Sequence, residues 1–499
     1  MAREKSFRPL YHFTPSNAWM NDPNGLVYYR GEYHLFYQHN PESISWGPMH
    51  WGHAVSQNLI DWEHLPIALY PDSLGTIFSG SAVIDWKNTA GFGKESMVAI
   101  FTHHKDGKQS QSLAYSNDSG RSWRKYSNNP VLVTQDNPQD FRDPKVFWYQ
   151  GNSDAYWVMC LAAGENVLFY RSPDLIHWTS CGKFHLDSSK RFGVWETPDL
   201  FELPIDEGSD SRWVLTIGAL EGSPAGGSGT MYFIGHFDGC TFTLENPLED
   251  IHWIDNGSDF YAAQSWNDEP NHRRIFIGWM SNWAYANNTP SEDWRGMLTL
   301  PRKVSLTRTE EGICLVQKPI AEVAALRCKS MSWQNITISK DNNLLKNIQG
   351  RNFEIISNFQ INNGSELFGF RVRVRNGEET VIAYNALTQK IFINRTHSGQ
   401  NNFHSEFAGI HSADLVPING SINIHIFVDS YSVEVFANNG QVTLTDCIFP
   451  AQRSLGIELF SENGDTQLNQ MDFYQLAKPN QFNCLSDVSR KNFGTLLNL

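Results

Sequence analysis

A short motif that ends in an aromatic residue recurs four times in the first half of the chain, and it limits the possible folds more than any other feature. Residues 56–62 and 172–178 share the pattern Ser-x-x-Leu-Ile-x-Trp. Residues 116–123 carry a related pattern with one extra residue, and residues 238–242 form a degenerate copy with Phe in place of Trp. The four aromatic residues are 61, 55 and 64 residues apart. A repeat of about 60 residues, with room for four short strands, is typical of a β-propeller blade.

A second series of positions runs in step with this repeat. Apolar strands are predicted to begin close to Asp22, Ser79, Asp143, Glu196 and Asp259, at spacings of 57, 64, 53 and 63 residues. Five such starts predict five blades. The first strands of propeller blades line the central channel, so we expect the leading ends of these strands to meet at one mouth of that channel.

After about residue 305 the pattern changes to short strands separated by turn residues, which is typical of a β-sandwich. The expected strands cover residues 353–361, 366–374, 380–387, 390–396, 422–429, 432–438 and 455–462. The aromatic content of 13% also fits a β-rich protein. This second domain could be purely structural or could help to bind a polymer.

The chain is therefore predicted to be all-β, with a five-bladed β-propeller followed by a C-terminal β-sandwich. We expect the propeller over residues 1–314, a helical or linker segment over 315–334, and the sandwich with a short C-terminal tail over 335–499. The edges of the sandwich could pair two copies, so both a monomer and a homodimer stay open.

Composition narrows the choice of partners and compartment. A formal net charge of −14 without a basic cluster disfavours nucleic acid and anionic membranes as partners, and no run of 18 apolar residues predicts a membrane span. The seven Cys are odd in number and form no Cys-x-x-Cys pair, which disfavours a disulfide framework and a zinc site. The first residues carry charge but no apolar signal segment, so we expect a cytoplasmic protein.

Three acidic neighbourhoods stand at expected blade starts: Asp22 within residues 19–25, Asp143 after Arg142, and Glu196 after Trp195. Taken singly, each is more often a turn or a surface ion pair. Taken together, they should converge at one channel mouth. Converging carboxylates repel one another, so a fold rarely keeps them for stability alone.

Paired carboxylates in an aromatic-rich pocket suit glycoside hydrolysis, in which one acid protonates the departing oxygen and one carboxylate attacks the anomeric carbon or activates water. Other chemistries have weaker support. The chain has no Gly-x-Ser-x-Gly and no His-Glu-x-x-His sequence, which disfavours a serine nucleophile and a metal centre. No metal ion or other cofactor is expected.

At these residues the chain resembles glycoside hydrolase family 32, the β-fructofuranosidases (invertases, exo-inulinases and levanases). The resemblance extends over about residues 8–475, and the matching motifs are Trp-Met-Asn-Asp-Pro-Asn-Gly at 19–25, Phe-Ser-Gly-Ser at 78–81, Phe-Arg-Asp-Pro at 141–144, Glu196 with Pro198-Asp199, Gly-Trp-Met at 278–280 and Ser-Val-Glu-Val-Phe at 432–436. One departure is Thr197, where many members have Cys, and it leaves open how the acid is tuned.

The resemblance implies a propeller followed by a sandwich, and it implies roles for individual residues. Asp22 would be the nucleophile, Glu196 the general acid/base and Asp143 the transition-state stabiliser. A fructosyl pocket would be lined by Asn21, Gln38, Trp46, Phe78, Ser79 and Arg142, with Trp19, Met20 and Trp279 close by. Tyr261 and Asp259 are further pocket candidates because they open the fifth blade.

We therefore predict a retaining β-fructofuranosidase that acts on a small saccharide, releasing terminal fructosyl units from sucrose and short fructans through a covalent intermediate. Sucrose 6-phosphate hydrolase and exo-levanase or inulinase are alternatives within the family. An inverting propeller glycosidase acting on arabinan or xylan is a further alternative, and so is a propeller that binds sugar without cleaving it.

Overall fold

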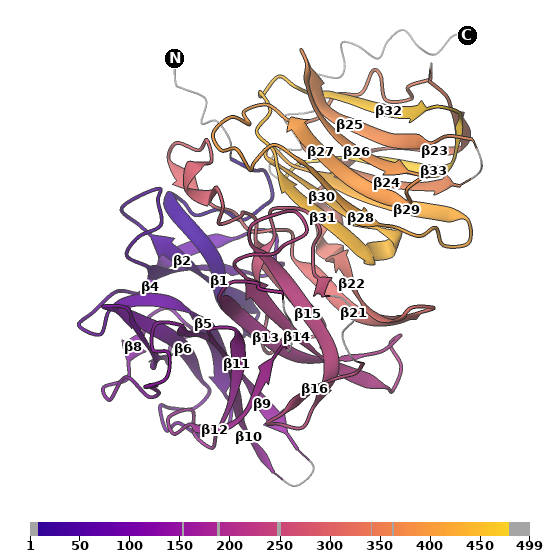
Figure 1. The fold of residues 1–499 in the computed structure, drawn as a ribbon. Coiled ribbons are helices and arrows are strands. Elements are labelled where there is room, and N and C mark those ends of the chain that lie inside the picture. The colour runs from indigo at the N-terminus through magenta and orange to yellow at the C-terminus, as the bar shows by residue number, and fades with distance from the viewer. Residues whose placement is uncertain are drawn as a thin grey trace.

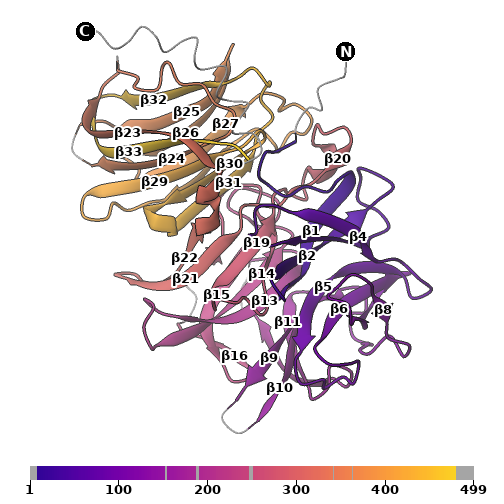
Figure 2. The same cartoon turned by 180° about the vertical axis from the view of Figure 1, so that it is seen from behind.

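The computed structural model describes residues 8–151, 154–186, 190–246, 251–340, 342–361 and 364–478. The first seven residues of the predicted propeller domain and the predicted C-terminal tail lie outside the described residues. Two domains lie side by side, with the sandwich packed against one side of the propeller (Figures 1 and 2). None of the helices in the described part of the chain is long and apolar enough to span a membrane.

Five sheets form the propeller, which confirms the five predicted blades. The first two blades contain β1 (Ala18–Tyr29), β2 (Glu32–Asn40), β3 (His50–Ser56) and β4 (Glu63–Leu69), then β5 (Thr76–Asp85), β6 (Ser96–Lys105), β7 (Lys108–Ser116) and β8 (Arg124–Lys125). The third contains β9 (Phe141–Gln150), β10 (Ala155–Ala163), β11 (Asn166–Ser172) and β12 (Thr179–His185). The first strands contact one another in cyclic order, β1 to β5, β9, β13, β18 and back to β1, so they surround the channel as predicted.

The last two blades complete the ring. The fourth contains β13 (Trp195–Pro204), β14 (Ser211–Ala219), β15 (Gly229–Phe237), β16 (Phe242–Leu244) and the short β17 (His252–Trp253). The fifth contains β18 (Tyr261–Ser265), β19 (Arg274–Trp279), β21 (Arg302–Thr309) and β22 (Gly312–Pro319). Between β19 and β21 lie a short 3-10 helix, η1 (Ala286–Asn288), and β20 (Trp294–Arg295). Because β20 pairs in parallel with β1 of the first blade, it ties the end of the ring to its beginning.

The repeated motif forms the turn between the third and fourth strands of the first four blades. In the first copy the Asn58 side chain accepts hydrogen bonds from the backbone N–H of Ile60 and Asp61, and Ser56 Oγ accepts from Asn58 N–H. Trp123 and Trp178 fold back onto their own turns and donate to backbone carbonyls. The repeat therefore marks a local turn structure that closes each of these blades.

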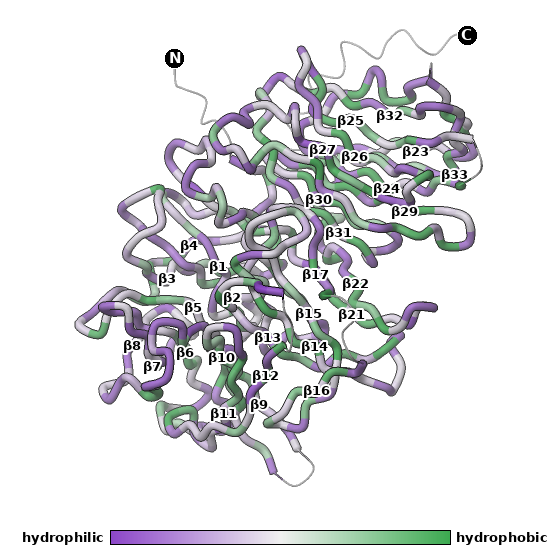
Figure 3. Tube along the Cα trace, in the orientation of Figure 1, coloured by the Kyte–Doolittle hydropathy of each residue, from purple (hydrophilic) through white to green (hydrophobic). Residues whose placement is uncertain are grey.

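The sandwich consists of two antiparallel sheets. One sheet contains, in order, β23 (Arg327–Ile338), β33 (Thr466–Leu476), β24 (Phe353–Gln360), β29 (Ser421–Val428), β30 (Ser432–Ala437) and β31 (Val442–Cys447). The other contains β28 (Ile410–Asp414), β27 (Lys390–His397), β26 (Glu378–Asn385), β25 (Leu367–Arg375) and β32 (Gly456–Glu462). Their facing side chains form one apolar core, and hydrophobic residues run along the sandwich strands in Figure 3.

The predicted linker over 315–334 is largely strand, which corrects the expected domain boundary. Strand β22 ends at Pro319 and belongs to the fifth blade, while β23 already begins at Arg327 in the sandwich. Only residues 320–326 connect them, mostly as a 3-10 helix, η2 (Ala321–Leu326). The alternation of polar and apolar residues in β22 is short, and β23 is an edge strand with mostly polar, exposed side chains. Neither strand therefore shows a clear strand pattern in the sequence.

Candidate active site

Each of the five inner strands carries an irregularity close to the same channel mouth. The pairing register shifts between Met20 and Pro23 in β1 and between Ile77 and Gly80 in β5, and similar shifts occur in β9, β13 and β18. Three residues at these shifts have a left-handed backbone: Asp143 (φ 63°), Thr197 (φ 46°) and Ala262 (φ 53°). Bulges re-aim side chains at the rims of sheets, and these ones lie where the predicted acidic residues are found.

Asp22 is held in place by two side-chain donors. Ser79 Oγ donates to Asp22 Oδ2 at 2.7 Å, and Asn21 Nδ2 donates to Oδ1 at 2.9 Å. Asn21 is itself oriented by Trp19, whose indole Nε1 donates to Asn21 Oδ1 at 2.8 Å. The motif around Asp22 therefore forms a chain of hydrogen bonds, and Asp22 is only 7% exposed.

Burial and the nearby charge of Glu196 raise the pKa of Asp22 to about 6, although the bonds from Ser79 and Asn21 act in the opposite direction. The group thus loses its proton at mildly acidic pH and is a carboxylate at neutral pH. Ser79, which bonds Asp22, lines one small pocket together with Asp143 and Thr197, so Asp22 and Glu196 lie in one site.

Both carboxyl oxygens of Glu196 accept hydrogen bonds. Arg142 Nε donates to Glu196 Oε1 at 3.1 Å, and the Tyr261 hydroxyl donates to Oε2 at 2.7 Å. Arg142 is fixed from behind by Asp140 at 3.0 Å and by Gln109 at 3.2 Å. Because Tyr261 lies buried beside Glu196, the pKa of its hydroxyl is raised well above the usual value, and it stays a hydrogen-bond donor.

Asp143 completes a group of three carboxylates. Its Oδ2 accepts a bond of 2.8 Å from the backbone N–H of Thr197, the residue after Glu196. Burial and the charge of Glu196 raise the pKa of Asp143, and the nearby Arg142 opposes that rise. The site therefore keeps a proton at pH values at which an isolated Asp side chain would have lost it.

Three residues that the sequence did not single out support this group from the second blade. Thr102 Oγ1 accepts from the Asp143 backbone N–H at 3.0 Å and donates to Gln111 at 2.7 Å. Gln111 donates to the Phe141 carbonyl at 2.7 Å, and Gln109 accepts from the Phe141 N–H at 2.8 Å. A run of polar residues at the start of β7, Lys-Gln-Ser-Gln-Ser, was the available signal for Gln109 and Gln111.

Aromatic side chains stand around the carboxylates. The Trp19 ring lies 6.0 Å from Trp279 and stacks on Trp283 at 6.2 Å, and Trp279 lies 6.5 Å from the Tyr261 ring. Trp283 was not predicted from the sequence. Trp19, Trp279 and Tyr261 are fully buried, and so is Met20, which packs in the same apolar cluster. These rings form a wall behind the carboxylates, and their contact with substrate stays a prediction.

Trp46 and Phe78 form a second aromatic pair near the mouth. Trp46 is 45% exposed and meets the edge of Phe78 at 6.1 Å, while Phe78 stacks on His104 at 4.6 Å. Gln38 lies deeper and donates to Asn24 at 2.8 Å, within the first blade. An exposed indole beside buried carboxylates offers a stacking surface for a sugar ring.

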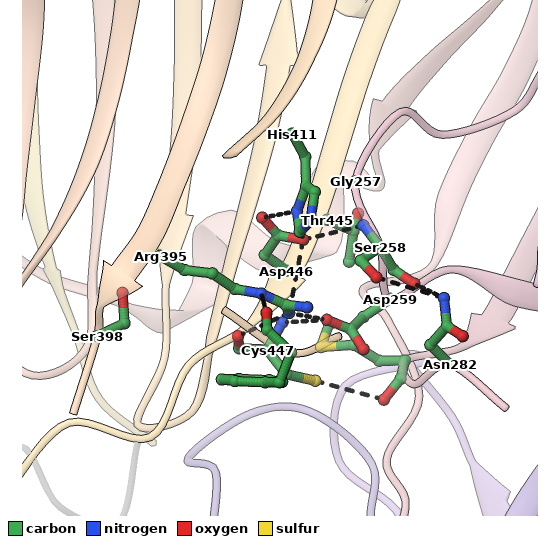
Figure 4. A network of polar contacts seen from close by, with 12 residues as sticks. Gly257, Ser258, Asp259, Asn282, Arg395, Ser398, His411, Thr445, Asp446 and Cys447 are labelled. Atoms are coloured by element: carbon green, nitrogen blue, oxygen red, sulfur yellow. Dashed lines mark hydrogen bonds and ion pairs between the residues drawn. The ribbon is translucent and has the colours of Figure 1, made fainter. Parts of the chain in front are cut away.

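Asp259 does not join the site, which corrects its prediction as a pocket residue. It precedes β18, and its carboxylate faces the sandwich, where it accepts from Arg395 Nη1 at 2.5 Å and from the Cys447 N–H at 2.8 Å (Figure 4). The Tyr285 hydroxyl donates to its other oxygen at 2.7 Å. The periodic spacing located the blade start correctly, but it did not determine which way the side chain points.

Across the described ranges no group of three or more His, Cys, Asp and Glu side chains is placed to hold a metal ion. The side chains present can supply a carboxylate, a proton donor, hydrogen-bond acceptors for hydroxyl groups, and aromatic surfaces. That set matches the requirements for cleaving a glycosidic bond.

Comparison with known proteins agrees with this chemistry. Residues 12–319 match the family model for the glycosyl hydrolases family 32 N-terminal domain, and residues 322–475 match the model for the family 32 C-terminal domain. The levanase of Bacillus subtilis is 48% identical over 486 residues, covering 95% of this chain and 71% of that protein.

Two solved structures share the fold. The exo-inulinase of Aspergillus awamori has a TM-score of 0.89 at 36% identity and covers 96% of this chain and 99% of its own. The β-fructofuranosidase of Schwanniomyces occidentalis complexed with fructosyl-erythritol has a TM-score of 0.88 at 29% identity, with coverage of 96% and 99%. The chain therefore belongs to glycoside hydrolase family 32.

Proposed function

We propose that this glycosidase is a retaining exo-β-fructosidase that releases terminal fructose units from fructans and, as a smaller substrate, from sucrose. The observation that carries the proposal is the placement of Asp22 and Glu196 in one site with different partners. Asp22 is held by neutral donors that favour a free carboxylate, and Glu196 lies between Arg142 and Tyr261. Asp22, a carboxylate at neutral pH, is suited to attack, and we assign proton transfer to Glu196 as the second carboxyl group of the site.

In the proposed reaction Glu196 protonates the glycosidic oxygen while Asp22 attacks C2 of the fructosyl unit. Cleavage requires the transferred proton to be on Glu196 before the glycosidic bond breaks. Asp143 then accepts hydrogen bonds from sugar hydroxyls, and these strengthen as positive charge builds on the ring. Glu196 next deprotonates the water that releases fructose from Asp22.

The relatives guide the choice of substrate. A levanase and exo-inulinases are among the most similar proteins, which favours fructans over sucrose alone. Sucrose 6-phosphate is a poorer candidate, because Arg142, the cation in this site, is already engaged by Glu196 and Asp140 and is not free for a phosphate.

A product assay tests the proposal directly. Incubation with levan, inulin, sucrose and sucrose 6-phosphate should release free fructose from the first three, with no intermediate oligosaccharides from the polymers. Proton NMR during early turnover should show β-fructofuranose first. Initial α-fructofuranose would point to the inverting alternative, and binding of all four saccharides without cleavage would contradict the enzymatic proposal.

The roles of the two carboxyl groups can be separated by the leaving group. Glu196→Ala should lose about 10²–10⁴ in rate on sucrose, since glucose leaves as a poor alkoxide leaving group unless its oxygen is protonated. On β-fructosyl fluoride the same variant should form the covalent intermediate at nearly the native rate, and added azide should then restore turnover. Asp22→Ala should be inactive on both substrates. Equal losses of Glu196→Ala on both substrates, without azide rescue, would remove Glu196 from the acid/base role.

A further inference from the structure

A cavity of about 530 Å³ opens at the other end of the propeller channel. Its lining includes Val83, Phe147, Leu200 and Trp266, which lie on or just after the same inner strands as the active-site residues but four or five residues further along the chain. At about 3.3 Å per residue, this places the cavity roughly 13–17 Å beyond the carboxylates. Its volume lies within the range of about 300–1,000 Å³ that small-molecule sites occupy.

Buried polar groups close the channel between the two mouths. Lys145 Nζ, from the third blade, donates to Asp199 Oδ2 at 2.9 Å and to the Ser265 carbonyl at 2.7 Å. Asn267 donates to the carbonyls of Ala82 and Val146 at 2.8 Å and 3.1 Å. The cavity is therefore a separate site and not an extension of the active-site pocket.

The rim of this cavity carries a fixed and exposed aromatic ring. Trp86 is 54% exposed, yet its indole Nε1 donates to Asp268 Oδ1 at 2.9 Å and its ring lies 5.9 Å from that of Tyr29. Next to it Lys87 Nζ lies 4.2 Å from the ring centroid of Trp148, which also lines the cavity. A rigidly held indole can stack on a sugar ring with little loss of side-chain freedom.

The charges that line the cavity balance. Arg273 pairs with Glu269 at 2.9 Å, and the two other lining cations, Lys87 and Arg274, are equal in number to the two other lining carboxylates, Glu202 and Asp268. This lining offers donors and acceptors for hydroxyl groups but no net charge for an anion such as a phosphate. Aromatic surfaces combined with balanced polar groups suit a neutral saccharide.

We propose that this cavity is a second, non-catalytic saccharide site, and that it holds a neutral fructan chain while the opposite mouth removes terminal units. The choice of fructan as the occupant rests on the proposed function. A polymer that binds at both mouths of one molecule binds more tightly, because the bound part keeps the free end at a high effective concentration near the active site. Sucrose is too small to bind at both mouths, so its affinity is not increased. The site therefore acts on the affinity for long chains and leaves the cleavage of short substrates unchanged.

Binding is best measured on the full chain with Asp22→Asn, which should leave the polymer intact. In native gels containing levan, the mobility of this protein should fall, and adding Trp86→Ala should weaken levan binding about tenfold, the loss expected for one aromatic stacking contact. Trp86→Phe keeps a ring and should bind with intermediate strength. Leu387→Ala, at an exposed apolar residue of the sandwich, is the matched control and should change nothing.

In the active protein, Trp86→Ala should raise KM for levan while kcat/KM for sucrose stays within about twofold of the parent. Unchanged levan binding by Trp86→Ala would overturn the second site, and equally strong binding of dextran would overturn fructan as its occupant. The two proposals fail separately. If the native chain releases no fructose but the Asp22→Asn protein still needs Trp86 to bind levan, the proposed function falls and the second site stands.

Discussion

At the scale of single residues, the site is organised before any substrate arrives. Asp22, Asp143 and Glu196 each accept at least one hydrogen bond from a buried donor on a different blade or a neighbouring residue. Such fixed donors position charges at no further cost in the reaction, and they also set the pKa values of the acids. Two residue-scale predictions follow from these contacts.

The first concerns the acidic limb of the pH profile. Because attack requires Asp22 as a carboxylate and its pKa lies at about 6, kcat/KM should fall as the pH drops through that value. The hydrogen bond from Ser79 lowers this pKa, so Ser79→Ala should move the acidic limb upward, by about one pH unit. Initial rates at low substrate concentration between pH 4 and 8 measure the shift.

Ser81→Ala is the matched control for this experiment. Ser81 lies two residues further along the same strand and donates to the Pro144 carbonyl at 2.8 Å instead of to Asp22. It should lower stability without moving the acidic limb. If both variants shift the limb equally, the change arises from a general disturbance of β5 and not from the bond to Asp22.

The second residue-scale prediction concerns Asp143. In Asp143→Asn the amide oxygen can still accept the Thr197 N–H, so the fold should be retained. If Asp143 acts mainly in the transition state, kcat should fall about 100-fold or more with little change in KM, because a bond to developing charge is lost. A melting curve recorded beside the kinetics gives the control. A drop in Tm in proportion to activity would instead make Asp143 a structural partner of Arg142.

At the scale of single elements, the bulged inner strands carry most of what the sequence could not predict. The spacing of Asp22, Asp143 and Glu196 predicted that they meet at one mouth, and they do lie in one site. The left-handed backbone at Asp143 and Thr197 was not predictable, since the β-branched Thr disfavours it and Asp, which tolerates it, adopts it here because the surrounding sheets impose it. Spacing along the chain does not determine where a side chain points, which also explains Asp259. It stands at the expected blade start, but its carboxylate faces the sandwich instead of the channel.

Strand β5 offers a test of how closely element geometry controls the site. A side chain at Gly80 would overlap the Ile100 carbonyl of the neighbouring strand, next to Ser79. Gly80→Ala should therefore push β5 away from β6, lower the free energy of unfolding by about 1–3 kcal/mol and reduce kcat/KM at least tenfold through the displaced Ser79. Denaturant unfolding and steady-state kinetics measure the two effects.

Gly208→Ala is the control for this strand experiment. Gly208 lies in the exposed turn between β13 and β14, where an added Cβ would lie 3.1 Å from the Ile205 carbonyl, a tight contact that a shift of a few tenths of an ångström in this turn relieves. Its effect on unfolding should stay within about 0.5 kcal/mol. Native activity in Gly80→Ala would show that the site tolerates a shift of β5.

At the scale of the whole molecule, buried ion pairs join the two domains. Arg302 of the propeller bridges Asp255 at 2.9 Å and Glu434 of the sandwich at 2.7 Å, and Arg395 of the sandwich reaches Asp259. The sequence indicated two domains but gave no sign of the contacts between them, because Arg302 and Glu434 are 132 residues apart and Arg395 and Asp259 are 136 residues apart. Breaking a buried pair typically costs about 3–5 kcal/mol, so the domains are expected to unfold together.

His12 extends the buried network of Arg302 and Glu434 and makes the stability of this arrangement depend on pH. The His12 ring lies ahead of β1 and bonds two sandwich carboxylates, Asp429 at 2.8 Å and Glu434 at 2.8 Å. Although burial alone would lower the pKa of His12, the two carboxylates raise it to about 9. Charged His12 also lowers the pKa values of Asp429 and Glu434, and these shifts arise from the same interactions that raise the pKa of His12.

The pH dependence follows from the direction of that shift. The folded protein holds the His12 proton more tightly than the unfolded chain, in which the pKa of His12 is near 6.5. Charged His12 therefore contributes fully to the free energy of unfolding below about pH 6.5, and this contribution is lost as the pH rises through about 9. The full contribution is on the order of 3 kcal/mol. Tm should therefore fall between pH 6.5 and 9 in the native chain, whereas His12→Gln, which keeps a hydrogen-bonding side chain without the proton, should start lower and stay nearly flat. Parallel curves for the two proteins over this range would show that His12 is neutral in the folded state.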